Sequence, residues 1–161
     1  MRSFILTLTL LFNSALFASG SRATLESETK NQLIEVFKEN EKLHAAFFNY
    51  DAKKINMIAT SLNKKMKLVK KNEVSKLLKQ AIVNAEKISK TSDRKKNNDY
   101  YADLSIALIY ILNKYDLGRE YNSYSCPMVK KKWVQNSKKK QKVHNPYAPE
   151  MPHCGRQDSR H

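Results

Sequence analysis

The chain has 161 residues, with 30 Lys and Arg against 15 Asp and Glu, which gives a formal net charge of +15. This length fits one domain of ordinary size, and 3 Gly and 4 Pro are few for the many tight turns of a β-sandwich or barrel. An apolar share of 41% is enough to build a core and argues against general disorder. Two cysteines are too few for a disulfide scaffold but enough for one bridge or one metal site.

Residues 1–20 have the pattern of a secretory signal peptide. Arg2 is followed by the apolar run Phe4–Phe12 and then by small residues that end at Gly20. A basic start, a short apolar run and small residues beyond it are the marks of such a peptide, and the run is too short to span a bilayer. We therefore predict cleavage after Gly20 and a soluble protein of residues 21–161, exported to the periplasm.

Four helical segments follow, and each has an apolar stripe at helical spacing. The first runs from Asn31 to Asn49, the second follows Asp51 as its N-cap, and the third and fourth end near Ile88 and Tyr115. The inward positions are, helix by helix, Leu33, Val36, Phe37, Leu43, Phe47, Phe48; Ile55, Ile58, Ala59, Leu62, Met66; Val74, Leu77, Leu78, Ala81, Ile82, Ala85, Ile88; and Tyr101, Leu104, Leu108, Ile111, Leu112, Tyr115. Short connections between such helices predict an all-α fold, an up-and-down antiparallel four-helix bundle over about residues 25–117. No strand is predicted.

The C-terminal residues 119–161 form a tail of a different kind. They have no apolar periodicity and hold both cysteines, the only tryptophan and three of the four histidines. A loop-rich segment of this length needs tethering to be ordered, so we predict that it packs across the bundle as part of the same domain. Trp133 and Tyr147 are then expected to be buried against the helices.

Two sulfur-containing pairs stand out in this tail. One is Cys126 with Met128, the other is Met151 with Cys154, and each pair has a proline inside it. Thiolate and thioether are soft ligands, which select Cu(I) or Ag(I) over hard cations. The prolines stiffen both pairs, so that little entropy is lost when an ion is bound. The spacing therefore suggests a soft-metal site.

The same residues also have a simpler interpretation. Two cysteines in an exported protein can form a disulfide, here closing a loop of about 28 residues and adding about 3–4 kcal/mol. Met128 and Met151 would then be packing groups. His44 and His153 are candidate imidazole ligands of a metal, but His44 lies in the apolar stripe of the first helix and equally fits a hydrogen-bonded core histidine. The residues alone leave both interpretations open.

The tail also resembles a known family. Its motifs are Tyr124-Ser-Cys-Pro-Met128, Trp133-Val-Gln-Asn136, Asn145-Pro-Tyr147 and Met151-Pro-His-Cys-Gly155. They are similar to the C-terminal signature of an uncharacterised family of exported helical domains, which occur alone or fused to CusB-type adaptors of copper/silver efflux pumps. The resemblance covers about residues 40–155. It implies a periplasmic role in Cu(I) or Ag(I) handling, with the four sulfur residues as ligands and an efflux adaptor as a partner.

The lysines suggest an alternative function. Residues 51–79 hold nine lysines and residues 129–144 hold seven, a pattern that is typical of nucleic-acid binding. A signal peptide would remove the protein from cytoplasmic DNA, so no nucleic-acid partner is predicted. The alternative is a cationic exported protein that binds an anionic membrane surface or an acidic partner, with Cys126 and Cys154 bridged. No catalytic triad, carboxylate pair or Cys-x-x-Cys motif is recognisable, so we predict no enzyme.

Overall fold

The computed structural model describes residues 22–70 and 72–161, and the predicted signal peptide lies outside this part. In the described part, four helices are followed by three short strands. The helices are α1 (Ser27–Asn49), α2 (Ala52–Leu68), α3 (Asn72–Ile88) and α4 (Arg94–Lys114), and the strands are β1 (Tyr121–Cys126), β2 (Lys131–Asn136) and β3 (Arg156–Gln157). Among these residues, no helix combines the length and the apolar character that crossing a membrane requires.

Local sequence accounts for where the helices begin and end. The carboxylate of Asp51 accepts a hydrogen bond of 3.0 Å from the backbone N–H of Lys54, which caps α2 as predicted. Asp93 caps α4 in the same way through the N–H of Lys96, also at 3.0 Å. Helix α1 ends at Tyr50, whose left-handed φ of 44° stops the helix and turns the chain toward α2.

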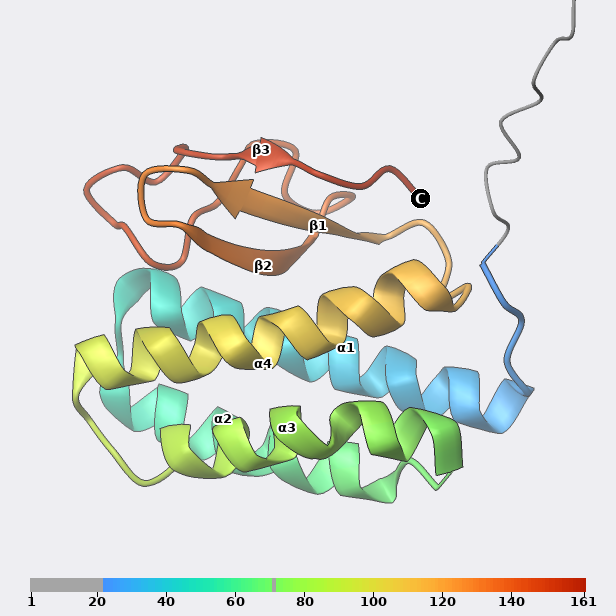
Figure 1. Ribbon diagram of the computed structural model, residues 1–161. Helices are drawn as coiled ribbons and strands as arrows, with labels where there is room; N and C mark the ends of the chain where they lie inside the picture. The colour runs from blue at the N-terminus through green and yellow to red at the C-terminus, as the bar shows by residue number, and fades with distance from the viewer. Residues whose placement is uncertain (1–21, 71) are drawn as a thin grey trace, which may run out of the picture.

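The helices form the predicted antiparallel bundle, in two layers. Helices α1 and α4 make the upper layer and α2 and α3 the lower one (Figure 1). Each helix packs on the next one along the chain, and the apolar stripes meet in one core. Between α1 and α4 the ring of Phe47 stacks on Tyr101, with centroids 4.4 Å apart. The predicted four-helix bundle is therefore confirmed.

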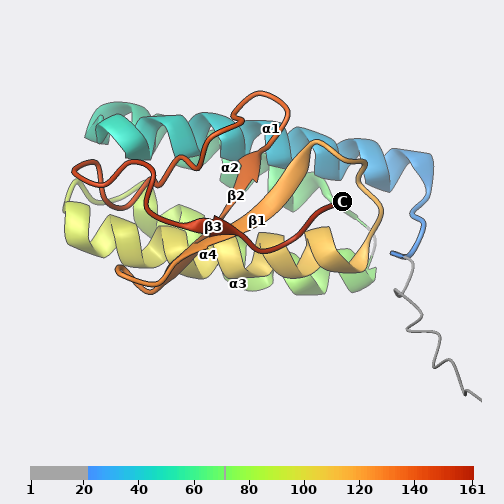
Figure 2. The same ribbon diagram turned by 90° about the horizontal axis from the view of Figure 1, so that it is seen from above.

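A small antiparallel sheet lies over α1 and α4 (Figures 1 and 2). Its strand order is β2-β1-β3. Strand β1 pairs with β2 from Tyr121 opposite Asn136 to Cys126 opposite Lys131, and with β3 at Tyr124 opposite Gln157. The prediction of a strictly all-α fold with a strandless tail is therefore wrong.

The strands escape detection in the sequence because both faces of β1 are covered. Tyr121 packs on Phe37 of α1, with ring centroids 5.3 Å apart. The side chain of the next residue, Asn122, donates to the hydroxyl of Ser137 at 2.9 Å and accepts from the backbone N–H of His161 at 2.9 Å. A strand that is buried on both faces lacks the apolar–polar alternation by which strands are recognised.

Large aromatic side chains fasten the tail to the bundle. Trp133 is 0% exposed and Tyr147 is buried, and their rings meet edge to face with centroids 6.1 Å apart. The ring of Tyr147 also lies 5.7 Å from that of Tyr101 in α4, and its hydroxyl donates to the carbonyl of Lys132 at 3.0 Å. The predicted packing of the tail across the bundle, with Trp133 and Tyr147 buried, is confirmed.

Candidate functional site

The structure brings the two cysteines together at one end of the sheet. Cys126 is the last residue of β1 and is buried, and Cys154 lies two residues before β3 begins. Both are free thiols, and they hydrogen-bond to each other. Two sulfur atoms that lie far apart in the sequence are therefore neighbours in the structure.

This close approach depends on Gly155. Its φ is +142°, and a Cβ atom at this position would lie 2.8 Å from the carbonyl oxygen of Ser125 and 2.9 Å from the ring of Trp133. Only glycine allows the backbone to pass so near without a clash. The next residue, Arg156, pairs with Ser125 across β3 and β1, so the strand pairing holds Cys154 beside Cys126.

Hydrogen-bond donors surround the sulfur atom of Cys126. Burial raises the pKa of this thiol, but hydrogen bonds from the Cys154 thiol, from the backbone N–H groups of Val129 and Met128 and from the side chain of Asn145 outweigh burial, so the pKa lies below its usual value. The hydrogen bond to Cys126 and burial raise the pKa of Cys154. The pair therefore favours a thiolate on Cys126 that is stabilised by the neighbouring thiol.

The thiol pair lies in positively charged surroundings. A cavity of about 280 Å³ beside Cys126 is lined by Ser125, Cys126, Pro127, Lys130, Lys131, Lys132 and Arg156. Two of these cations are paired with carboxylates: the Lys131 ammonium lies 2.6 Å from Asp99 in α4, and Nε of Arg156 lies 3.3 Å from Asp158. Positive charge near a thiol favours its deprotonated form. The electrostatics of this end of the sheet and the hydrogen bonds act in the same direction.

The other predicted sulfur ligands lie in the two turns that carry the cysteines. Met128 is two residues after Cys126, and its side chain is 70% exposed. Met151 is partly buried, and its carbonyl accepts the backbone N–H of Cys154 at 3.0 Å. His153 is exposed, and its Nδ1 lies 2.7 Å from the carbonyl oxygen of Val143. The structure thus places both methionines and His153 near the cysteines along the chain, with the His153 Nδ1 already hydrogen-bonded.

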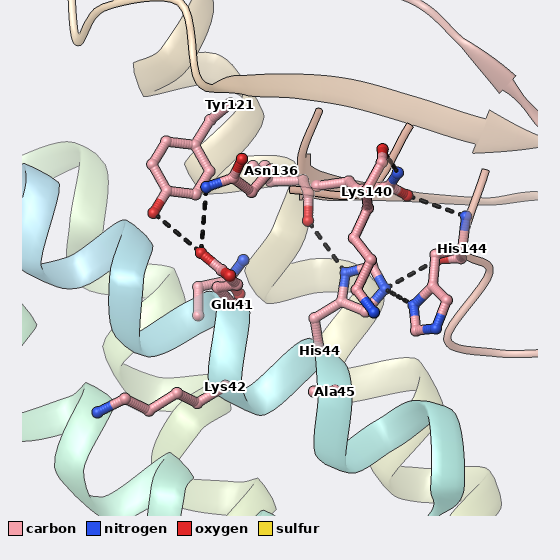
Figure 3. Close-up of a pocket in the computed structure, with 11 residues that line it drawn as sticks. Glu41, Lys42, His44, Ala45, Tyr121, Asn136, Lys140 and His144 are labelled. Atoms are coloured by element: carbon pink, nitrogen blue, oxygen red, sulfur yellow. Dashed lines mark hydrogen bonds between the residues drawn. The ribbon is translucent and has the colours of Figure 1, made fainter. Parts of the chain in front are cut away.

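His44 lies in a different site (Figure 3). It is 5% exposed, and its Nδ1 is 3.2 Å from the carbonyl oxygen of Val134 in β2. Its Nε2 is 2.9 Å from Nδ1 of His144 and 2.8 Å from the carbonyl oxygen of the same residue. These contacts fit the interpretation of His44 as a hydrogen-bonded core histidine. They join α1 to the sheet and to the segment that follows it.

The His44 site borders a cavity of about 200 Å³ between α1, β2 and the segment after β2. The carboxylate of Glu41 at its edge accepts hydrogen bonds from Tyr121 and Asn136, at 3.3 and 3.2 Å, and lies 3.0 Å from the ammonium of Lys139 (Figure 3). The ring of His144 stacks on Phe48, with centroids 3.6 Å apart. The cavity therefore has two imidazoles on one side and a neutralised carboxylate on the other.

Two residues of these sites escaped the sequence analysis as functional candidates. His144 stands at the end of a lysine-rich stretch without periodicity, where nothing links it to His44. Asn145 is fully buried, and it donates from its side chain to the carbonyl of Cys154 at 3.1 Å and from its backbone to that of Pro152 at 2.9 Å. The available signal for Asn145 was the Pro and Tyr that follow it, a sequence that favours a local turn. In this turn the side chain of Asn145 accepts the N–H of Tyr147 at 2.9 Å.

Comparisons with known proteins give no relative: no protein-family model, no curated protein and no solved structure matches this chain. The resemblance of the tail motifs stays a prediction. In residues 22–70 and 72–161, no group of three or more His, Cys, Asp or Glu side chains is placed to hold a metal ion.

The buried histidines predict a loss of stability in acid. Burial lowers the pKa of His44 from its usual 6.5 to about 4, so the folded state holds this ring neutral while the unfolded chain takes up a proton as the pH falls below 6.5. The free energy of unfolding is therefore expected to be highest above pH 6.5 and to fall by about 2 kcal/mol between pH 7.5 and pH 5. Burial also lowers the pKa of the more exposed His144 to about 4, in the same direction.

Urea unfolding at the two pH values measures this difference. The variant His44→Gln keeps an amide donor for Val134 but does not titrate, so the part of the pH dependence that comes from His44 should disappear while the part from His144 remains. The variant His153→Gln is the matched control, because the side chain of His153 is exposed. If His44→Gln loses as much stability in acid as the wild type does, His44 is not the titrating group.

Proposed function

We propose that the protein binds one Cu(I) or Ag(I) ion through Cys126 and Cys154 and serves in the handling of these ions outside the cytoplasm. The adjacent thiols carry this proposal, because they are the only pair of soft side-chain donors in hydrogen-bond contact among the described residues. Soft ions prefer sulfur ligands, and Cu(I) accepts low coordination numbers. Two thiolates are therefore a sufficient protein contribution to a site.

The hydrogen bonds around the thiols suit an ion as well as a proton. A soft ion bound between the two sulfur atoms would displace thiol hydrogen, so binding would release protons. The backbone N–H groups of Met128 and Val129 would remain bonded to the Cys126 sulfur, which holds the ligand in position. The Cys126 sulfur is thus held in position before an ion binds.

The surrounding charge is compatible with this complex. One Cu(I) ion with two thiolates has a net charge of −1. The cavity beside Cys126 has Lys130 and Lys132 in its lining, together with Lys131, which pairs with Asp99, and Arg156, which pairs with Asp158. These cations repel a free metal ion but stabilise the anionic complex, and they favour the thiolates that the ion needs.

Substitution of the methionines distinguishes a metal site from a disulfide. A disulfide between Cys126 and Cys154 needs neither thioether, whereas a soft ion gains a third ligand when Met128 or Met151 turns toward it. Each Met→Ala substitution is therefore expected to weaken Cu(I) binding by about 1–3 kcal/mol. The exposed side chain of Met128 is free to reorient, because most of its surface contacts solvent.

A competition titration tests the proposal. Cu(I) is titrated under reducing conditions against a chromophoric Cu(I) chelator, for the wild type, Met128→Ala and Met151→Ala. Met57→Ala is the matched control, since Met57 is 67% exposed but lies on α2, in the layer of the bundle away from the sheet. The wild type should compete for one equivalent of Cu(I). A wild type that removes no Cu(I) from the chelator would rule out the proposed function.

The cellular context of this proposal comes from the sequence. The signal-peptide pattern of residues 1–20 supports export to the periplasm, and the tail motifs support an efflux adaptor as the partner that receives the ion. Fractionation of cells that express the full chain, with the metal content and free thiols of the purified protein, tests both the location and the state of Cys126 and Cys154.

The exposed lysines favour a second candidate function, binding to an anionic surface by a protein whose cysteines are bridged. Helices α2 and α3 form the layer away from the sheet (Figure 1), and their exposed lysines are Lys53, Lys54, Lys64, Lys67, Lys76, Lys79 and Lys87. This function predicts binding to phosphatidylglycerol vesicles that weakens steeply with salt, because exposed charges are screened over about 8–10 Å. A sedimentation assay at low and physiological salt measures it. Absence of binding at low salt would contradict it.

A further inference from the structure

The contacts of His44 leave one of its nitrogen atoms facing an oxygen atom without a proton between them. A neutral imidazole has one N–H and one bare nitrogen. Nδ1 of His44 faces the carbonyl of Val134, and Nε2 faces the carbonyl of His144. With the proton on Nδ1 of His44, the lone pair of Nε2 can accept from Nδ1–H of His144 at 2.9 Å, but it also lies 2.8 Å from the carbonyl oxygen of His144, and two acceptors in contact repel each other.

A cation at Nε2 would remove this conflict. Nδ1–H of His44 would then donate to Val134, which is how histidine ligands are commonly oriented in metal sites. The Nε2 lone pair and the carbonyl oxygen of His144 would both face positive charge. Nδ1 of His144, 2.9 Å from Nε2, would supply a third donor atom.

The distances fit one metal ion. Two ligand atoms at right angles around an ion, each about 2.0–2.1 Å from it, lie about 2.9 Å apart. Nε2 of His44 is 2.9 Å from Nδ1 and 2.8 Å from the carbonyl oxygen of His144. Ligands at tetrahedral angles would lie about 3.3 Å apart at the same bond length. The observed spacing thus matches the square arrangement of nitrogen and oxygen ligands that Cu(II) prefers.

We propose that Nε2 of His44, Nδ1 of His144 and the carbonyl oxygen of His144 form a Cu(II) site on the wall of the cavity between α1, β2 and the segment after β2. The cavity of about 200 Å³ gives the ion access and leaves room for water on its open positions. Both imidazoles are neutral at neutral pH, because burial lowers their pKa values to about 4, so both lone pairs are available without loss of a proton.

Charges of both signs lie around the two rings. The ammonium of Lys140 opposes a cation, since it also lowers the pKa values of His44 and His144. The carboxylate of Glu41 acts in the opposite direction on His44. The site does not involve the thiol pair, so this proposal can be tested independently of Cu(I) binding at the cysteines.

The test uses a background without thiols, because Cys126 and Cys154 would reduce or bind added copper. The double variant Cys126→Ser/Cys154→Ser of the full chain is titrated with CuCl2 at pH 7.5 and studied by pulsed EPR, which counts the imidazole nitrogens that are coupled to the copper. One equivalent with two coupled imidazoles is expected. The double Cys→Ala variant serves as a second background in case serine disturbs the sheet.

His144→Phe supplies the decisive comparison, because phenylalanine keeps the stack on Phe48 and removes the ligand nitrogen. It should lower the Cu(II) affinity at least about tenfold and remove the signal of two coupled imidazoles, while circular dichroism shows that the variant is folded. His161→Phe and His153→Phe are controls that should retain both. No Cu(II) binding in either thiol-free background, or two coupled imidazoles that persist in His144→Phe, would overturn the proposal.

Discussion

Replacing Cys126 or Cys154 by serine is expected to lower the Cu(I) affinity by about three orders of magnitude, or about 4 kcal/mol. Serine offers a hard, neutral oxygen in place of a soft thiolate, which Cu(I) disfavours. The larger loss is expected at Cys126, because its sulfur accepts the hydrogen bonds of the turn and has the lowered pKa. The competition titration with a Cu(I) chelator measures both variants.

Glycine variants can change the arrangement of the two thiols without changing the number of thiols. In Gly155→Ala the added Cβ meets the carbonyl of Ser125 at 2.8 Å, so the segment with Cys154 must move although no sulfur is lost. Gly118→Ala is the matched control: Gly118 also has a positive φ, +89°, but a Cβ there meets nothing within 4 Å. Both substitutions strain the backbone, and only Gly155→Ala should weaken Cu(I) binding. Equal affinities of the two variants would show that the close approach of the thiols is not what binds the ion.

The helices could be predicted from the sequence because each one is buried on one side only. Leu33, Phe37 and Leu62 lie in the core, and the charged residues between them face solvent, so the helical period is visible in the residue types. Caps such as Asp51 mark the helix starts by a local hydrogen bond. These signals act within a few residues and need no knowledge of the rest of the fold.

The sheet could not be predicted because its stability comes from distant partners. The segment Tyr121–Cys126 has asparagine and serine at positions that are buried in the structure, and these polar groups bond to Ser137, Ser159 and His161. Such a segment resembles a loop until the chain returns over it. Tertiary contacts therefore decide the secondary structure of the tail.

The candidate site was predictable only in part, because some of its residues are marked by residue type and others come together only through tertiary contacts. Cysteine and methionine pairs in a short tail reveal soft donors through residue type alone, whichever way the chain folds. The pairing of His44 with His144, and the role of Asn145 beside the thiols, depend on how the tail crosses α1 and on where it turns back. No local pattern in the sequence encodes either.

Trp133→Ala is expected to lower the free energy of unfolding by about 3–5 kcal/mol, the usual cost of truncating a large buried aromatic side chain. Trp133 is in contact with each part of the tail that carries the thiols: it stacks with Tyr124 of β1 at 6.0 Å between centroids, and it meets Tyr147 and the backbone at Gly155. The truncation should mainly weaken the packing of the sheet on α4, because β2 makes the main contact of the sheet with that helix.

Urea unfolding followed by circular dichroism measures the change, with Trp133→Phe and Ile106→Ala for comparison. Phenylalanine keeps an aromatic ring in the same place and should lose less than half as much stability. Ile106 is an exposed apolar residue of α4, so its truncation should change the stability by less than about 0.5 kcal/mol. Because the same ring supports the strands that hold Cys126 and Cys154, Trp133→Ala should also weaken Cu(I) binding under conditions in which the bundle stays folded. A Trp133→Ala variant with wild-type stability would show that the sheet and the helices unfold independently, and the thiol pair would then need no support from the bundle.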